Sequence, residues 1–249
     1  MRFERRAPPL YEDDPHWEKK LSALLDIPSD RFVDEFWPRW NEVNQSLRDR
    51  GLRVGPFSFY AWNDGDPGFV RALWRMIRHL KPEIVVETGV AHGLTSRFIL
   101  EAFALNGAGT LWSIDLPPFN PDSRPEVGVA VSEERLRARW SYIKGTSRRR
   151  LPRLLGMLPR IDLFIHDSMH SNRNMMFEFE LIWEHLGVGG ILVSDDVDAS
   201  TAFFEFAQRH ADCPSLVCSA EPMAPDMRRY NKKGLFGIIY KSHLGFEAK

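Results

Sequence analysis

Acidic residues follow several short apolar runs of this sequence, and they are the first indication of chemistry. Glu87, Asp115 and Asp167 each end or follow such a run, and Asp195 and Asp196 end another. If these runs are strands of one parallel sheet, their carboxyl ends meet at one edge, where open α/β sheets bind ligands. Carboxylates gathered there raise each other's pKa unless a positive centre, a hydroxyl donor or a metal ion compensates them. The pattern therefore predicts a binding site for a ligand of that kind.

The turn after the first run reads ETGVAHG, from Glu87 to Gly93. It departs from the dinucleotide fingerprint G-x-G-x-x-G because Ala91 replaces the middle glycine, which disfavours a pyrophosphate. Gly89 and Gly93 let the backbone approach a compact ligand, and Glu87 suits an ammonium group. Asp115 follows by about 20 residues, where an acid accepts hydrogen bonds from ribose hydroxyls. These residues together indicate an amino-acid nucleoside; the simpler alternative is a strand-turn-helix junction with two exposed acids.

The elements that must position these residues alternate along the chain. Short apolar or β-branched runs, typical of buried strands, are separated by segments with helical spacing. We predict strands at 82–87, 110–115, 161–166, 191–196, 215–220 and 235–240, and helices at 96–105, at 147–158 and after caps at Ser171 and Asp198. This alternation is typical of an α/β fold with a doubly wound, mostly parallel sheet and helices on both faces.

Two amphipathic stretches precede the first strand. Apolar residues share one helical face over 30–47 and again over 67–80. Core packing explains most of this pattern, and a lid or a subunit contact in a homo-oligomer is the alternative for the rest. We predict an N-terminal helical extension or lid over residues 1–65 and a main domain over residues 66–249. The long segment 117–131 is a further candidate lid or binding element.

The composition limits the classes of partner. The 249 residues are 43% hydrophobic, which is enough for one well-packed domain with an appendage. Lys and Arg total 33 against 34 Asp and Glu, and this net charge of -1 argues against nucleic acid or an anionic membrane as partner. No stretch approaches the ~20 apolar residues that span a bilayer, so we expect a cytoplasmic protein. Cys213 and Cys218 are predicted to be buried thiols.

Four segments in combination resemble the class I S-adenosylmethionine-dependent methyltransferases, near the macrocin-type and other natural-product O-methyltransferases. They read VVETGVAHGLTS, LWSIDLPP, IHDSMHSNRNMMFEFELIW and GGILVSDDV, and the likeness covers about Trp62 to Lys241. It implies a seven-stranded Rossmann-like sheet. It also implies that Glu87, Gly89 and Gly93 bind the methionine part of S-adenosylmethionine and that Asp115 binds its ribose.

Other cofactor contacts follow less closely from the resemblance. The loop after the third strand often carries an acid near the adenine in this family, whereas here it offers Gly145, Thr146 and Ser147. We predict these three residues, together with Ser96 and Asp167, as further cofactor contacts. The groups that bind the adenine stay open.

The resemblance further implies a divalent cation held by Asp167, Asp195 and Asp196. Three carboxylates form a hard oxygen site that suits Mg²⁺, which would activate and orient a substrate hydroxyl. His170 would then take the hydroxyl proton as general base, with Asp167 beside it in the catalytic group. Taken singly, Asp195 and Asp196 could begin the next helix or cap a turn, and His170 could be a packed ring. We assign His166 to core packing.

Three functions of different classes remain. The leading one is an S-adenosylmethionine-dependent O-methyltransferase, assisted by Mg²⁺, that acts on a hydroxyl of a small molecule, either a sugar or a phenolic natural product. A metal-independent enzyme is a variant of it. The second is a nicotinamide-dependent oxidoreductase, disfavoured by the missing middle glycine. The third is a non-catalytic module that binds S-adenosylmethionine.

Overall fold

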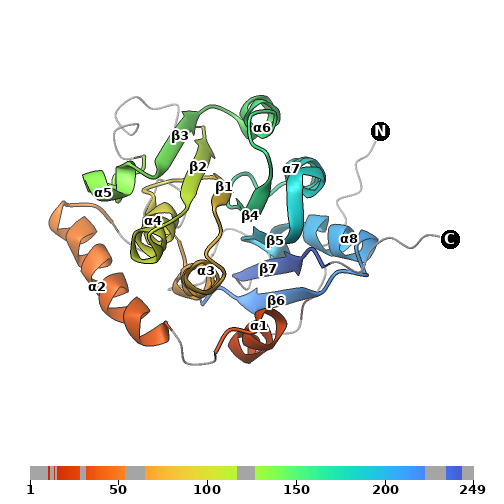
Figure 1. Cartoon of the computed structure of the whole chain (residues 1–249), viewed down its shortest axis with the longest axis horizontal. Coiled ribbons are helices and arrows are strands. Elements are labelled where there is room, and N and C mark those ends of the chain that lie inside the picture. The colour runs from red at the N-terminus through yellow and green to blue at the C-terminus, as the bar shows by residue number, and fades with distance from the viewer. Residues whose placement is uncertain are drawn as a thin grey trace.

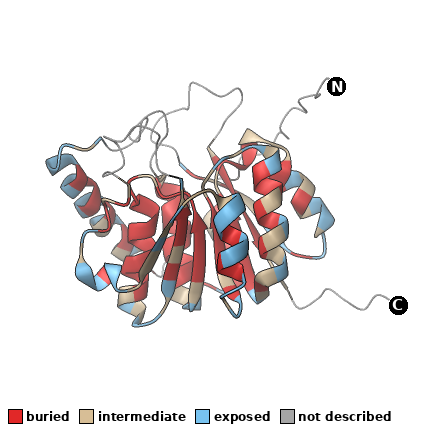
Figure 2. Cartoon of the chain, turned by 90° about the horizontal axis from the view of Figure 1, so that it is seen from above, coloured by how far each residue is buried: buried red, intermediate tan, exposed pale blue. Residues whose placement is uncertain are grey.

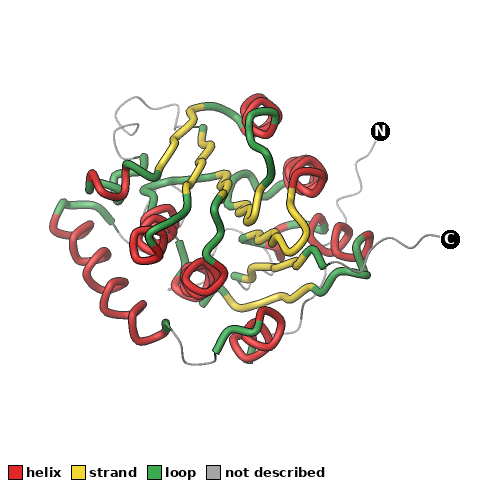
Figure 3. Tube along the Cα trace, in the orientation of Figure 1, coloured by secondary structure: helices red, strands yellow, loops and turns green. Residues whose placement is uncertain are grey.

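The computed structural model describes Tyr11, Asp14 and residues 16–28, 32–53, 65–116, 127–221 and 234–242. Residues 117–126 of the predicted lid segment therefore lie outside the described residues. Figures 1 and 3 show the arrangement of the elements. The helices are α1 (Trp17–Leu25), α2 (Val33–Asp49), α3 (Pro67–Leu80), α4 (Leu94–Asn106), α5 (Glu134–Arg137), α6 (Ser147–Leu155), α7 (Asn172–His185) and α8 (Ala202–Arg209). The strands are β1 (Ile84–Thr88), β2 (Thr110–Asp115), β3 (Trp140–Lys144), β4 (Ile161–His166), β5 (Leu186–Ser194), β6 (Ser215–Ser219) and β7 (Leu235–Tyr240).

These strands form one seven-stranded sheet in the order β3-β2-β1-β4-β5-β7-β6. Neighbours from β3 to β5 pair in parallel, while β7 runs antiparallel to both β5 and β6. The predicted α/β fold with a mostly parallel, doubly wound sheet is confirmed. The order reverses next to β1, because the chain first moves outward to β3 and then returns to β4 on the other side. Ligands bind beside such a reversal in open α/β sheets.

Helices cover both faces of the sheet, so its strands must be apolar on both sides. Val85 of β1 packs in the cluster with α3 and α4, and its neighbour Val86 packs in the opposite cluster with α6, α7 and α8. Figure 1 shows these two sets of helices on opposite sides of the strands, and Figure 2 shows the strands as a buried layer. Each fully buried Val or Leu side chain contributes roughly 1.5–3 kcal/mol to stability. This double burial explains why the strands read as continuous apolar runs.

The N-terminal helices pack on the α3–α4 side. Phe36 and Trp40 of α2 contact Phe98 of α4, with ring centroids 5.2 and 5.6 Å apart, and Trp17 of α1 lies 5.5 Å from the ring of Phe236. The Trp74 indole N–H donates to the Phe32 carbonyl at 3.1 Å. The aromatic stripes of this extension are therefore packed core residues in the described part of the chain, as the spacing indicated. The boundary between residues 65 and 66 stays a prediction.

Two predicted helix caps have different outcomes. Ser171 caps α7 as expected, since its hydroxyl accepts from the Asn174 backbone N–H. The cap predicted at Asp198 was wrong: this residue lies in a 3-10 turn over Val197–Ala199, and α8 begins only after Thr201. Asp196 has a φ of 52°, which turns the chain before any α-helix can begin.

Two further expectations concern the cysteines and the membrane. Cys213 and Cys218 are both buried free thiols, as predicted. Among the described helices, none combines the length and apolar character needed to cross a bilayer.

Candidate functional site

The predicted site residues lie along one rim of the sheet because β2, β1, β4 and β5 are parallel neighbours. Backbone hydrogen bonds continue the ladder past the strand ends. The Gly89 N–H donates to the Ile114 carbonyl at 2.9 Å, the Asp167 N–H to the Thr88 carbonyl at 2.8 Å, and the Asp195 N–H to the His166 carbonyl at 2.8 Å. These bonds hold four turns side by side, so the acids that are distant in sequence follow neighbouring strands, as predicted.

Glu87 is fully buried at the end of β1. Its Oε2 accepts hydrogen bonds from the Ser96 hydroxyl at 2.8 Å and the Ser113 hydroxyl at 2.5 Å, and the Trp140 indole N–H donates to the Ser113 oxygen at 2.8 Å. Burial raises the pKa of Glu87 to about 7; the two hydroxyls act against this rise, and Asp115 adds to it. Its Oε1 has no hydrogen-bond partner among the described residues. A buried carboxylate oxygen left in this state needs a donor, and an ammonium group is the strongest one.

The glycines of the turn are required by its geometry. Gly89 has a φ of +91°, and a Cβ at this position would lie 1.9 Å from the Asp167 carbonyl oxygen. Gly93 has a φ of +83°, and its Cβ would lie 2.9 Å from the Gly128 Cα. Asp115 accepts from the backbone N–H groups of Ala91, Leu116 and Val90; burial raises its pKa, and these hydrogen bonds act against the rise. Asp115 therefore fixes the turn from the neighbouring strand.

Residues 127–131 pack directly on this turn. The Gly128 N–H donates to the Ala91 carbonyl and the Ala130 N–H to the His92 carbonyl, both at 2.9 Å. Arg50, the residue that follows α2, donates to the Val129 carbonyl at 3.0 Å. The described end of the predicted lid segment is thus attached both to the glycine turn and to the N-terminal extension.

An ion cluster that is buried at Arg97 and Glu101 and exposed at Glu133 and Arg135 supports this attachment. Arg97 of α4 bonds the Ala130 carbonyl and pairs with Glu101 at 2.6 Å and with Glu133. Arg135 pairs with Glu101 at 2.9 Å and with Glu133 at 2.6 Å. The cluster ties α4 to the chain just after the lid segment, so the backbone beside the turn is held from two directions.

Of the three cofactor contacts predicted after the third strand, Gly145 and Thr146 lie between β3 and α6, and Ser147 is the first residue of α6. The Gly145 N–H donates to the Asp115 carbonyl at 2.8 Å, and Thr146 is the N-cap residue of α6. The Ser147 hydroxyl bonds the buried Glu178 carboxylate. Their backbone lies at the rim beside Asp115, and their contacts with a cofactor stay a prediction.

His170 lies between two of the predicted metal ligands. Its Nε2 is 3.3 Å from the Asp196 Oδ2 and 4.0 Å from the Asp167 Oδ1, and its side chain is 8% exposed. Among the described residues, no three His, Cys, Asp or Glu side chains come close enough to hold a metal ion. Asp167, Asp195 and Asp196 thus share the rim, but their side chains do not form the expected three-carboxylate site in this arrangement.

Glu178, a carboxylate that several residues of this rim contact, was not among the predicted site residues. Glu178 of α7 is completely buried, and its Oε2 accepts from the His166 ring at 2.7 Å and from the Thr88 hydroxyl at 2.6 Å. His166, which we assigned to packing, does pack edge-on against Phe179 but is also hydrogen-bonded through Nδ1. One signal was available: Glu178 lies three residues after Met175, on the apolar face of its helix.

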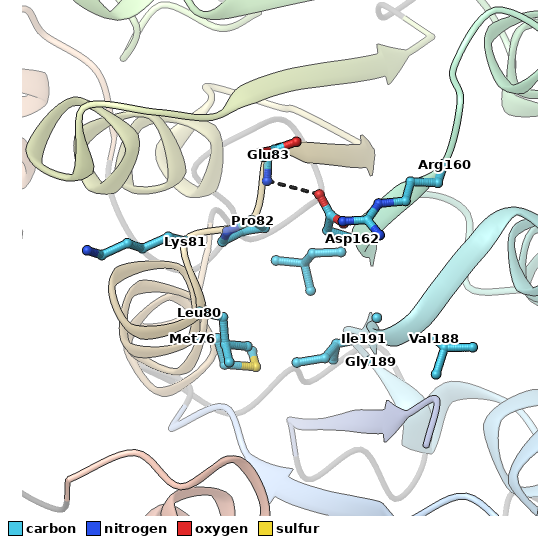
Figure 4. A pocket seen from close by; sticks show the side chains of 12 residues that line it. Met76, Leu80, Lys81, Pro82, Glu83, Arg160, Asp162, Val188, Gly189 and Ile191 are labelled. Atoms are coloured by element: carbon cyan, nitrogen blue, oxygen red, sulfur yellow. Dashed lines mark hydrogen bonds and ion pairs between the residues drawn. The ribbon is translucent and has the colours of Figure 1, made fainter. Parts of the chain in front are cut away.

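A separate hollow of about 300 Å³ lies at the opposite edge of the sheet (Figure 4). Its wall includes Met76, Leu80 and Ile191, with Arg160 and Asp162 at one side. Arg160 and Asp162 pair at 3.2 Å, and Asp162 Oδ2 accepts from the backbone N–H groups of Glu83 and Ile84. These polar groups stabilise the start of β1, and the hollow lies far from the acidic rim.

Known proteins share the fold that carries these residues. The family model described as "Methyltransferase domain" matches residues 86–197, from β1 through the acids after β5. No curated protein matches the chain. Solved structures share the architecture: TomG, an O-methyltransferase from Streptomyces achromogenes involved in tomaymycin synthesis, solved with SAM, is 14% identical with a TM-score of 0.56, over 91% of this chain and 96% of TomG.

Two further structures agree. An O-methyltransferase from Bacillus cereus, solved with SAH, is 14% identical with a TM-score of 0.55, over 90% of this chain and 97% of its own. A methyltransferase from Geobacter sulfurreducens is 16% identical with a TM-score of 0.54, over 94% and 98%. The fold is that of the class I methyltransferases. The match to the methyltransferase domain model covers residues 86–197 and therefore includes the glycine turn and the acids that follow the strands.

Proposed function

We propose that this protein transfers the methyl group of S-adenosylmethionine to a hydroxyl of a small molecule. The observation that carries the proposal is the buried Glu87, whose Oε1 lacks a hydrogen-bond partner among the described residues. Glu87 precedes a turn in which the positions of Gly89 and Gly93 leave no room for a Cβ atom. An amino-acid ammonium group would fill this need, and Asp115 on the next strand would accept from ribose hydroxyls. The similar structures solved with SAM and SAH support this choice of cofactor.

His170 is the best candidate for the general base. The acceptor hydroxyl would give its proton to the imidazole while its oxygen bonds the methyl carbon and the sulfur–methyl bond breaks, leaving S-adenosylhomocysteine. The carboxylates of Asp196 and Asp167, at 3.3 and 4.0 Å from Nε2, would stabilise the imidazolium that forms. Such a base typically accounts for about 10²- to 10⁴-fold in rate.

Dependence on Mg²⁺ stays a prediction, and no step above is routed through a metal. If Mg²⁺ binds, Asp167, Asp195 and Asp196 are the residues that would hold it, and their carboxylates would have to move together. The acceptor is a hydroxylated small molecule, and we expect neither nucleic acid nor a membrane as partner. A cytoplasmic location and a homo-oligomeric assembly are also predictions, which cell fractionation and light scattering test.

The first test is binding. Calorimetry with S-adenosylmethionine, S-adenosylhomocysteine and NADH, each with and without Mg²⁺, separates the two cofactor classes. We expect the adenosyl ligands to bind and NADH not to bind. A ligand at 100 times its Kd stabilises the fold by about 2.7 kcal/mol, so thermal unfolding gives a second readout. Binding of NADH alone would refute the proposal in favour of an oxidoreductase.

The second test is turnover. Release of S-adenosylhomocysteine is measured over a panel of sugars and phenols, with Mg²⁺ and with excess EDTA, for wild type and His170→Asn. We expect the variant to bind the cofactor normally and to lose about 10²-fold or more in kcat. Equal turnover with and without EDTA would show a metal-independent enzyme. Cofactor binding with no transfer to any acceptor would favour a non-catalytic module.

A further inference from the structure

Glu178 connects four elements of the rim through one buried carboxylate. Its Oε1 accepts from the Ser168 hydroxyl at 3.0 Å and the Asn174 amide at 2.9 Å. Its Oε2 accepts from the His166 ring and the Thr88 hydroxyl, and Ser147 at the start of α6 adds a further bond. A carboxylate has about four lone-pair sites, so these five donors use all of its accepting capacity.

The network keeps this carboxylate ionised. Burial by itself raises the pKa of Glu178, but the interaction with His166 and the hydrogen bonds from Ser147 and Thr88 outweigh burial and hold the pKa well below its usual range. The His166 ring therefore donates from Nδ1 to a carboxylate. A buried charge that is fully hydrogen-bonded fixes the positions of its donors, because moving any of them leaves a buried polar group unpaired.

The donors lie on both sides of Asp167. His166 precedes it and Ser168 follows it, and both bond Glu178 directly. The Asn174 amide donates to the Met169 carbonyl at 3.2 Å as well as to Glu178, so the next residue of the loop is held through Asn174. The His170 ring meets the His166 ring edge-on, with centroids 5.3 Å apart and planes at 87°. The loop that carries Asp167 and His170 is thus attached to the Glu178 carboxylate through His166, Ser168 and Asn174.

We propose that Glu178 is a positioning residue for the reaction, which holds the loop from Asp167 to His170 so that the imidazole faces the acceptor. Glu178 touches neither cofactor nor acceptor and acts through Ser168, His166 and Asn174. This inference rests on the proposed function, because it assigns the loop to the chemical step. A misplacement of about 1 Å in a catalytic group can reduce the rate by about 10²-fold, which sets the scale of the effect.

Glu178→Gln tests the proposal with little change of shape. Its amide oxygen can still accept from His166 and Thr88, but its NH₂ group then meets the Asn174 NH₂ group, and two donors face each other. The hydrogen bonds from Thr88 and His166 stay intact, whereas the hydrogen bond from Asn174 beside the loop is lost. Ser168→Ala is a milder variant that removes one loop contact and leaves Glu178 in place. Glu180→Gln is the matched control, because Glu180 lies on the same helix, is 58% exposed and pairs with Arg209 on the surface.

Three readouts are compared: the Kd of S-adenosylhomocysteine by calorimetry, kcat and KM for both substrates, and the ¹H–¹⁵N signals of the histidine rings. We expect kcat to fall about 10- to 100-fold in Glu178→Gln and less in Ser168→Ala, with the Kd within about twofold of wild type. The His166 and His170 ring signals should shift in Glu178→Gln. Glu180→Gln should match wild type in all three readouts.

The outcomes separate this inference from the proposed function. Unchanged ring signals and a kcat within about twofold of wild type in both loop variants would overturn the role of Glu178. If Glu178→Gln does not fold, Ser168→Ala decides. If wild type binds the cofactor but methylates no acceptor, the proposed O-methylation fails, and the ring signals alone then show whether Glu178 positions the loop. A Kd that weakens as much as kcat falls would assign Glu178 to the cofactor turn instead and also overturn the proposal.

Discussion

Glu87 should make the stability of the cofactor-free protein depend on pH, and Glu87→Gln should abolish that dependence. Burial raises the pKa of Glu87 from its usual 4.5 to about 7 in the folded state. Below its unfolded-state pKa, such an acid is protonated in both states and the folded protein keeps its full stability. As the pH rises from the unfolded-state pKa through the folded-state pKa, the unfolded state ionises first and the folded protein loses stability. Wild type should therefore lose stability across the range from about pH 4.5 to about pH 7.

The size of the effect follows from the shift. At 1.36 kcal/mol for each pKa unit, the shift corresponds to about 3 kcal/mol, most of which falls between about pH 5 and about pH 8. The glutamine of the variant is uncharged throughout, and its amide oxygen can still accept from Ser96 and Ser113. The difference in unfolding free energy between the two proteins should change by this amount over that range.

Urea denaturation of wild type and Glu87→Gln at several pH values is the assay, with and without S-adenosylhomocysteine. The ammonium group of this ligand should stabilise the ionised carboxylate, so wild type should regain stability at the higher pH and bind with release of up to one proton near neutral pH. The variant should bind weakly and without proton release. A stability difference that stays constant from pH 5 to pH 8 would refute the reasoning.

Two further changes test the backbone and the ion cluster beside the site, both by urea denaturation. Gly89→Ala should lower the free energy of unfolding by about 3 kcal/mol or more, because its Cβ meets the Asp167 carbonyl. Gly107→Ala, at a φ of +75° with open space around it, should lower it by about 1 kcal/mol. Equal losses would contradict the close approach at Gly89. Arg97→Met should cost about 2 kcal/mol because it leaves the buried Glu101 carboxylate with Arg135 as its remaining described ion-pair partner, and Arg209→Met, in an exposed pair, should cost less than about 1 kcal/mol.

The fold could be predicted because its signals are local. Six of the seven strands are short, mostly apolar runs, and packing on both faces of the sheet favours that pattern. The seventh, β3, reads WSYIK and is only partly buried, so apolar patterning did not predict it. The shared rim of Glu87, Asp115 and Asp167 followed from the same alternation, since parallel strands place their carboxyl ends together. The cap at Asp198 was wrong because the left-handed conformation of Asp196 is not encoded in residue type: Asp both caps helices and adopts positive φ.

Glu178 could not be assigned from sequence because its role depends on contacts between distant residues. Thr88 lies 90 positions before Glu178 in the sequence. The hydrogen bond between them forms because β1 pairs with β4 and α7 packs against β4. Helical spacing shows that Glu178 shares a face with apolar residues, but it does not reveal the donors that meet it there. The same limit applies to His166, whose ring looks like core packing until its partner is known.

The attachment of Gly128 and Ala130 to the glycine turn has a mechanical consequence. Two backbone hydrogen bonds, to the carbonyls of Ala91 and His92, join these residues to the turn, and the Arg97 guanidinium donates to the Ala130 carbonyl. The glycine turn and residues 128–130 therefore form one mechanically coupled unit of backbone, so a shift of either segment is transmitted to the other.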